Sequence, residues 1–246
     1  ENIVELQNGC ICCTIQGDLQ KTMLDLIDKM TKGDISYFDK VLIETTGLAD
    51  PVPIIHTLIS SMDLQRIYTL DGVITVVDAT NGEKTLDLQP EAVKQAALAE
   101  RIIISKIDLI EKDKELSLET RLRAINPSIK IIKSSFGDVS ISDLIDLGAY
   151  DPFSKSRDVK EWLAAESMDT HHDHDHDHHH VNVNRHDENI EAFSMTSDKP
   201  VNMMAFGLFK DLLMAQMGPD LLRLKGIINI EGKDCPAVIH GVQHIF

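Results

Sequence analysis

Apolar residues follow two kinds of pattern along the first 150 positions. Short runs that are apolar on both faces lie at 40–43, 72–78, 101–105 and 129–133. Between them, apolar residues recur at every third or fourth position in 17–32, 51–62, 89–99 and 115–125. The runs predict buried strands and the recurring positions predict helices. Their alternation predicts an α/β fold with a mostly parallel sheet, whose chemistry lies at the C-terminal ends of the strands.

The pattern changes after about residue 148, where Ser, Asp and Lys accumulate and a low-complexity tract follows. Periodicity returns at 190 and predicts a small α+β lobe, with strands at 190–196, 223–231 and 237–246 and a helix at 201–217. We therefore predict three parts: a first domain at 1–149, a linker at 150–189 and a partial second domain at 190–246.

Composition narrows the classes of protein that fit. The chain is 43% apolar, enough for a full core, and it has a formal net charge of -16. That charge excludes a nucleic-acid surface, because a polyanion would be repelled and the basic residues form no block. The sequence has neither an apolar run long enough to span a membrane nor a signal peptide at its start. We therefore predict a cytoplasmic protein without nucleic-acid or membrane partners.

Three thiols lie within four residues, at Cys10, Cys12 and Cys13, on a turn that leads into the predicted helix at 17–32. A helix N-terminus lowers thiol pKa values and so favours the thiolate form, which binds soft or borderline divalent metal ions. These cysteines are therefore predicted to bind a metal ion, with a fourth ligand from elsewhere. The alternatives are small buried residues or a redox pair.

A carboxylate follows the predicted strand at 40–43, in the segment Glu44-Thr-Thr-Gly47. A carboxylate at a strand end can hold Mg²⁺ or its water shell, and a glycine three residues later lets a backbone N–H approach a terminal phosphate. Glu44 and Gly47 are therefore candidate catalytic residues. A surface turn with an incidental glutamate is the alternative.

The segment Ser105-Lys106-Ile-Asp108 closes the predicted strand at 101–105. In guanine-binding sites, the aspartate of such a turn accepts hydrogen bonds from the base N1–H and exocyclic amine, while the lysine stem packs along the ring. Ser134 follows the next predicted strand, where a second base-contacting loop should lie. We predict that Ser105, Lys106, Asp108 and Ser134 bind nucleotide, although a four-residue match also arises by chance.

The low-complexity tract holds seven histidines and three aspartates in ten residues. Neutral imidazoles bind Zn²⁺, Ni²⁺, Co²⁺ and Cu²⁺, and interleaved carboxylates raise ligand basicity. The tract is predicted to bind several ions loosely, because a disordered segment loses conformational entropy when it wraps each ion. A solvated polar linker is the alternative. The predicted ligands are His171, His172, His174, His176, His178, His179 and His180.

Taken in order, these motifs resemble consecutive signatures of the CobW family of P-loop GTPases, which includes the HypB and UreG nickel-insertion proteins, and especially its YjiA-type members. The resemblance covers nearly the whole chain except about 150–190. The segments that carry it are Glu5–Thr14, Ile43–Pro51, Val76–Ala79, Ser105–Asp108, Leu222–Ile228 and His240–Phe246.

The resemblance implies a GTPase that acts as a metallochaperone. GTP binding or hydrolysis would gate delivery of a divalent ion, with zinc favoured over cobalt or nickel, to a client metalloprotein. It implies GTP, Mg²⁺ and Zn²⁺ as cofactors, and it allows a homodimer. A passive metal store or sensor is the rival function, and a cobalamin-biosynthesis accessory protein is a third. The physiological metal and the client stay open, because these ligands accept several ions.

The sequence departs from the family pattern in two ways. Ser105 stands where Asn or Thr is more usual, which is expected to weaken guanine discrimination slightly. The family's phosphate-binding loop, Gly-x-x-Gly-x-Gly-Lys-Thr, should precede the cysteine motif and is not in the sequence. We therefore expect a fragment that does not hydrolyse GTP alone, since the β- and γ-phosphates lack their cradle.

Overall fold

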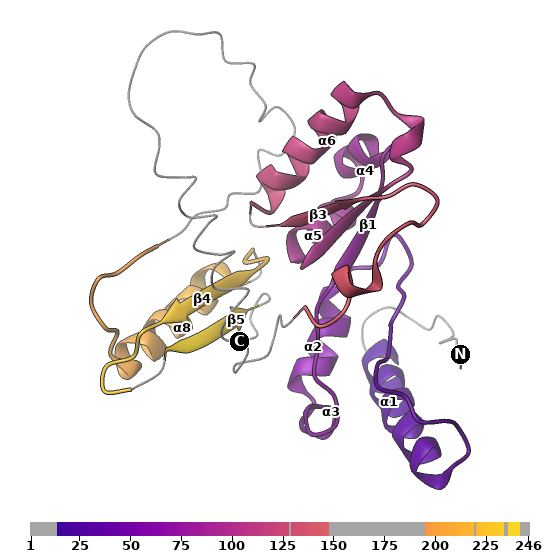
Figure 1. Ribbon diagram of the computed structural model, residues 1–246. Coiled ribbons are helices and arrows are strands. Elements are labelled where there is room, and N and C mark those ends of the chain that lie inside the picture. The colour runs from indigo at the N-terminus through magenta and orange to yellow at the C-terminus, as the bar shows by residue number, and fades with distance from the viewer. Residues whose placement is uncertain (1–13, 128, 148–194, 219, 234–235, 242–246) are drawn as a thin grey trace, which may run out of the picture. The chain divides into compact units, whose positions relative to one another are not determined.

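The computed structural model describes residues 14–127, 129–147, 195–218, 220–233 and 236–241. The chain divides into two compact units, Glu1–Leu70 and Asp71–Phe246. Figure 1 shows the elements of both units.

From residue 14 on, the described part of the first unit contains the helices α1 (Thr14–Lys32), α2 (Val52–Ser60) and α3 (Met62–Gln65). Leu19 and Met23 of α1 are buried together with Leu64 of α3. The Tyr68 hydroxyl donates a hydrogen bond of 2.8 Å to the Met23 carbonyl, and burial raises the pKa of this tyrosine. The predicted helices at 17–32 and 51–62 are thus confirmed, the second as two helices.

The predicted buried strand at 40–43 is wrong. Residues 40–46 belong to no strand of the structure, and Leu42 is 84% exposed. A strand needs a neighbour that satisfies its backbone N–H and C=O groups, and no segment in the described residues pairs with this one. An apolar run alone could not reveal whether a described segment lies beside it as a partner.

The second unit contains a three-stranded parallel sheet in the order β1-β2-β3, which confirms the predicted α/β class. Its strands β1 (Ile74–Asp78), β2 (Arg101–Ser105) and β3 (Lys130–Lys133) coincide with three of the predicted runs. The connecting helices are α4 (Gly82–Leu88), α5 (Pro90–Leu98) and α6 (Lys112–Ile125). The short helix α4 was not predicted, because its seven residues hold too few apolar positions to show periodicity.

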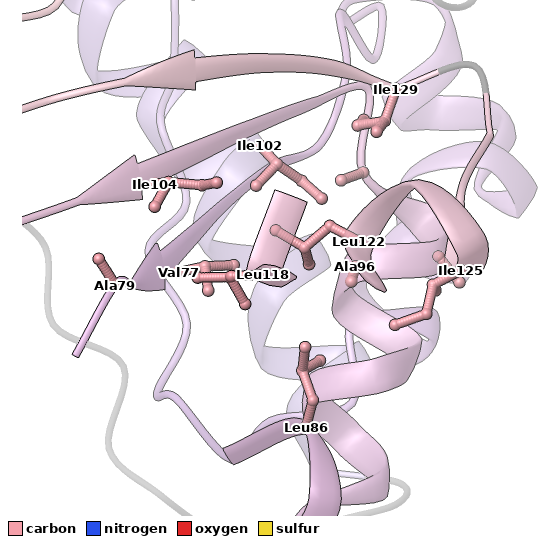
Figure 2. Packing of buried hydrophobic residues seen from close by; sticks show 12 residues of the cluster. Val77, Ala79, Leu86, Ala96, Ile102, Ile104, Leu118, Leu122, Ile125 and Ile129 are labelled. Carbon is pink, nitrogen blue, oxygen red and sulfur yellow. The ribbon is translucent and has the colours of Figure 1, made fainter. Parts of the chain in front are cut away.

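The core of this unit lies between the sheet and its helices. Ile102 and Ile104 of β2 are fully buried and belong to one cluster with Leu118 and Leu122 of α6 (Figure 2). Gly82 begins α4 where a Cβ atom would lie 2.8 Å from Val77 Cγ1. This close approach explains why the position lacks a side chain, since a larger residue would force the packed core apart.

Asn126, just after α6, holds the end of α5 in place. Its buried side-chain amide donates to the carbonyls of Ala96, Ala97 and Ala99, at 3.1, 3.2 and 3.0 Å. The last carbonyls of a helix have no partner within the helix, so they need such donors when they are buried.

Replacing Asn126 with Ala should lower the free energy of unfolding by about 1–3 kcal/mol, because buried carbonyls lose a donor. Asn126→Asp should cost more, since a carboxylate would face the same carbonyls. Urea unfolding measures both effects, and Asn229→Ala, at an exposed position, is the control. Unchanged unfolding midpoints in both variants would contradict this role.

The described residues from 195 onwards contain α8 (Met203–Met217) and an antiparallel pair of strands, β4 (Leu224–Ile228) and β5 (Ala237–Gly241). The Asn202 side chain caps α8 by accepting from the backbone N–H groups of Met204 and Ala205. The predicted helix and the predicted strand at 223–231 are thus confirmed in shortened form, and the strand predicted at 237–246 is confirmed over 237–241, the part that the structure describes. Most of the predicted strand at 190–196 lies outside the described residues.

Candidate functional site

The C-terminal ends of the three parallel strands meet at one edge of the sheet. Asp78 ends β1 beside Ser105, which ends β2, and Ser134 follows β3 directly. The Ser134 backbone N–H donates to Ile104, and its carbonyl accepts from Ile107 at 3.4 Å, so the β3 loop is tied to the turn after β2. In sheets of this type, ligands bind at this edge.

The turn after β2 carries the predicted base-recognition residues. Lys106 adopts a left-handed backbone conformation, with φ of 59°, and the short helix η1 (Ile107–Leu109) follows. The Asp108 side chain is exposed on this helix. Ser105 donates through Oγ to the Val77 carbonyl at 3.3 Å, which fixes the start of the turn.

Asp78 holds the lysine of this turn. Its carboxylate lies 2.7 Å from Lys106 Nζ and also accepts from the Thr80 backbone N–H and hydroxyl, at 2.8 and 2.6 Å. The Lys106 ammonium and the Thr80 hydroxyl hold the pKa of Asp78 well below its usual range. The Asp78 carboxylate therefore stays ionised at neutral pH, and its ion pair restricts the lysine side chain. Sequence reasoning gave Asp78 no role, although its place after an apolar strand was a usable signal.

A cavity of about 700 Å³ opens at this edge, and all four predicted nucleotide-binding residues line it. The wall of the cavity is mostly apolar, and Ser105, Lys106 and Asp108 are among the residues that line it. Such a lining suits a flat heterocycle that offers hydrogen-bond donors along one edge. The apolar wall residues, which sequence reasoning did not single out, are Val76, Ile103, Leu109, Phe136, Val139 and Leu144.

The predicted catalytic residues Glu44 and Gly47 belong to the first unit and are exposed. Gly47 lies in a turn in which the Ala49 backbone N–H donates to the Thr46 carbonyl at 3.0 Å, and Glu44 lies two residues before this turn. The structure therefore gathers the nucleotide-binding candidates within the second unit, and the catalytic pair remains a separate prediction.

The predicted metal ligands lie outside the described residues: Cys10, Cys12 and Cys13 precede residue 14, and the histidine tract falls within 148–194. Within the part of the chain that the structure describes, no group of three or more His, Cys, Asp or Glu side chains could hold a metal ion. The metal-site predictions therefore stay predictions. No helix among the described residues is long and apolar enough to cross a membrane.

Two family descriptions match the chain. Residues 1–133 match the CobW/HypB/UreG nucleotide-binding domain, and residues 190–246 match the cobalamin synthesis protein cobW C-terminal domain. The chain is similar to zinc chaperone YjiA of Escherichia coli, with 30% identity over 99% of this chain and 70% of the relative. It is 33% identical to zinc-regulated GTPase metalloprotein activator 1 of Saccharomyces cerevisiae, over 60% of this chain and 38% of the relative.

The crystal structure of Zn(II)-bound YjiA GTPase from E. coli has a similar fold, with a TM-score of 0.68 and 28% identity. A Zn(II)-bound triple mutant of YjiA GTPase gives a TM-score of 0.72. Each likeness covers 92% of this chain and 65% of the solved chain. The likeness thus extends over both the nucleotide-binding and the C-terminal domain matches.

Proposed function

This chain belongs to the CobW/HypB/UreG family, and on that premise we propose that it is part of a GTP-dependent metallochaperone. GTP binding and hydrolysis gate the transfer of a divalent transition metal to a client protein. Zinc is the proposed cargo because similar proteins are named zinc chaperone and zinc-regulated GTPase, with cobalt or nickel as alternatives. A second copy of the chain is a further proposed partner.

The observation that carries this proposal is the cavity at the strand ends, where Lys106 and Asp108 line the same space. The Asp108 carboxylate accepts hydrogen bonds from the N1–H and exocyclic amine of guanine. The aliphatic stem of Lys106, held at its ammonium by Asp78, packs along the ring. Ser105 and Ser134 shape the two loops that hold the base.

Glu44 and Gly47 are the proposed residues at the phosphates. The exposed carboxylate of Glu44 suits Mg²⁺, which prefers oxygen ligands and retains several waters. When bound, this ion would neutralise charge on the phosphates. The Gly47 backbone N–H would donate to the terminal phosphate, which a side chain at this position would hinder.

Hydrolysis also needs a phosphate-binding loop, and the 246 residues contain no Gly-x-x-Gly-x-Gly-Lys-Thr segment. We propose that the 246-residue chain alone does not hydrolyse GTP, because the β- and γ-phosphates would have no such loop to hold them. The proposed division is a nucleotide-binding domain at 1–149, a linker at 150–189 and a C-terminal domain at 190–246.

The proposed cargo site is the cysteine cluster at Cys10, Cys12 and Cys13, which binds the ion as thiolates. The histidines of 171–180 collect further ions with lower affinity. This tract favours a second candidate function, passive metal storage, in which nucleotide has no effect on metal binding. The name of the matched C-terminal domain favours a third, an accessory role in cobalamin synthesis.

The proposed GTP site and the proposed metal site at the cysteine cluster should be coupled in the full-length protein. We expect a non-hydrolysable GTP analogue to change zinc affinity at the tight site by about fivefold or more, since coupling between linked sites is typically of this size. A competition titration against a chromophoric chelator, with and without the analogue, measures the change. By reciprocity, zinc must change the affinity for the analogue by the same factor.

Two variants distinguish tight binding at the cysteine cluster from weak binding at the histidine tract in this titration. Changing Cys12 and Cys13 to Ser should abolish tight binding, because serine hydroxyls stay protonated at neutral pH. Deleting 171–180 should remove only weakly bound ions and leave GTP hydrolysis intact. Equal zinc affinity with and without the analogue would contradict the metallochaperone proposal and favour storage.

A further inference from the structure

One aromatic side chain in the candidate site is placed in an unusual way. Phe136 is 95% exposed and lines the cavity together with Lys106 and Asp108. Its backbone φ is 54°, in the left-handed region that bulky residues rarely adopt. The exposed ring and the disfavoured backbone conformation both lower the free energy of unfolding. No contact of Phe136 among the described residues offsets this cost.

The loop around Phe136 is firmly anchored at its base. Ser134 is only 3% exposed, and its backbone bonds to Ile104 and Ile107 join it to β2 and the base-recognition turn. A further hydrogen bond of 3.1 Å, from the Asp138 N–H to the Ser135 carbonyl, closes the loop. These bonds hold Phe136 at the loop tip, next to the cavity.

Two flat apolar surfaces therefore line one cavity from different loops: the stem of Lys106 and the ring of Phe136. A planar base that offers its edge to Asp108 leaves its two faces for such surfaces. Stacking removes the ring and the base face from water and adds the attraction between aromatic systems. Strained residues of this kind persist mainly where a ligand uses them.

We propose that Phe136 stacks on the purine ring of the bound nucleotide, opposite the stem of Lys106. This inference rests on the proposed function, because the edge of the base must face Asp108. The two residues then have different roles. Asp108 determines which purine is bound, and Phe136 contributes affinity without contributing specificity, because every purine has an aromatic face.

These different roles predict how Phe136 variants of the full-length protein bind nucleoside diphosphates. Phe136→Ala should weaken GDP, XDP and IDP binding alike, by about fivefold or more, with the GDP to XDP ratio unchanged. Phe136→Trp should retain affinity, and its fluorescence should be quenched when GDP binds. Phe136→Gly should weaken GDP binding as much as Phe136→Ala does. It should have a higher melting temperature than Phe136→Ala, because glycine adopts positive φ without strain.

Titration of each variant with the three diphosphates measures these effects, and thermal unfolding checks that each variant is folded. Leu116→Ala is the matched control, since Leu116 is 64% exposed on α6 and does not line the cavity. Unchanged GDP affinity in Phe136→Ala, or a changed GDP to XDP ratio, would overturn the stacking role. Asp108→Asn is measured in parallel. If this variant also leaves GDP affinity unchanged, the base does not bind at the proposed site, and the stacking role of Phe136 is rejected together with the proposed function.

Discussion

Replacing Asp108 with asparagine should weaken GTP binding by the full-length protein roughly tenfold to a hundredfold, because hydrogen bonds to a charged group are lost. The asparagine amide presents donors where guanine also presents donors. Xanthine carries a carbonyl in place of the exocyclic amine and can accept from that amide, so XTP affinity should rise. Displacement of a fluorescent nucleotide by GTP, XTP and ATP measures the change in preference.

A matched control lies on the neighbouring loop. Asp138 is also exposed, but it does not line the cavity, so Asp138→Asn should leave the order of preference unchanged. If both variants keep wild-type affinity for GTP, the cavity at the strand ends does not hold the base. If both lose affinity equally, the effect is one of overall charge, because the chain is strongly acidic.

The parallel sheet could be predicted from sequence because its strands are nearly uniform in character. Ile102, Ile103 and Ile104 are all buried, so β2 appears as a continuous apolar run. The motif at its end could then be placed by the general rule that ligands bind where parallel strands end. The same rule placed Ser134 at this edge of the sheet, where the structure has it directly after β3.

The run at 40–43 shows that an apolar segment does not always form a strand. Its residues have the same apolar character as β2, yet they form no strand in the structure. Whether a run becomes a strand depends on a neighbour that supplies backbone hydrogen bonds, and a single segment carries no information about that neighbour. Phe136 was missed for a related reason, since its left-handed backbone and its exposure appear only in three dimensions.

The contacts of Glu100 were also beyond the reach of sequence patterns. One carboxylate oxygen accepts from Arg223 and the other lies 2.6 Å from Lys225 Nζ. Arg223 also donates to the Ala99 carbonyl at 2.6 Å. The partners lie more than 120 positions along the chain, in the Leu222–Ile228 segment, whose resemblance to the family suggested no partner. Within the second unit, this cluster links the start of β2 to the start of β4.

Replacing Glu100 with glutamine should lower the free energy of unfolding by about 3–5 kcal/mol, because two poorly solvated cations lose their shared counter-charge. Glu100 is 8% exposed, and the Arg223 and Lys225 side chains are 15% and 18% exposed. Glu119 is a matched control, since it also has two basic partners, but these are 39% and 46% exposed. Glu119→Gln should cost about 1 kcal/mol or less.

The same cluster should make stability depend on pH in acid. Burial disfavours the charged form of Glu100, but the charges of Arg223 and Lys225 outweigh it and hold the pKa below its usual value of 4.5. The contribution of a carboxyl whose pKa is lowered by folding is complete above the unfolded value and is lost as pH falls through the folded value. Wild-type stability should therefore decline below about pH 4.5, and Glu100→Gln should decline less steeply. Urea unfolding at a series of pH values compares the two slopes. Parallel curves would mean that Glu100 is not the group whose protonation weakens the link between β2 and β4.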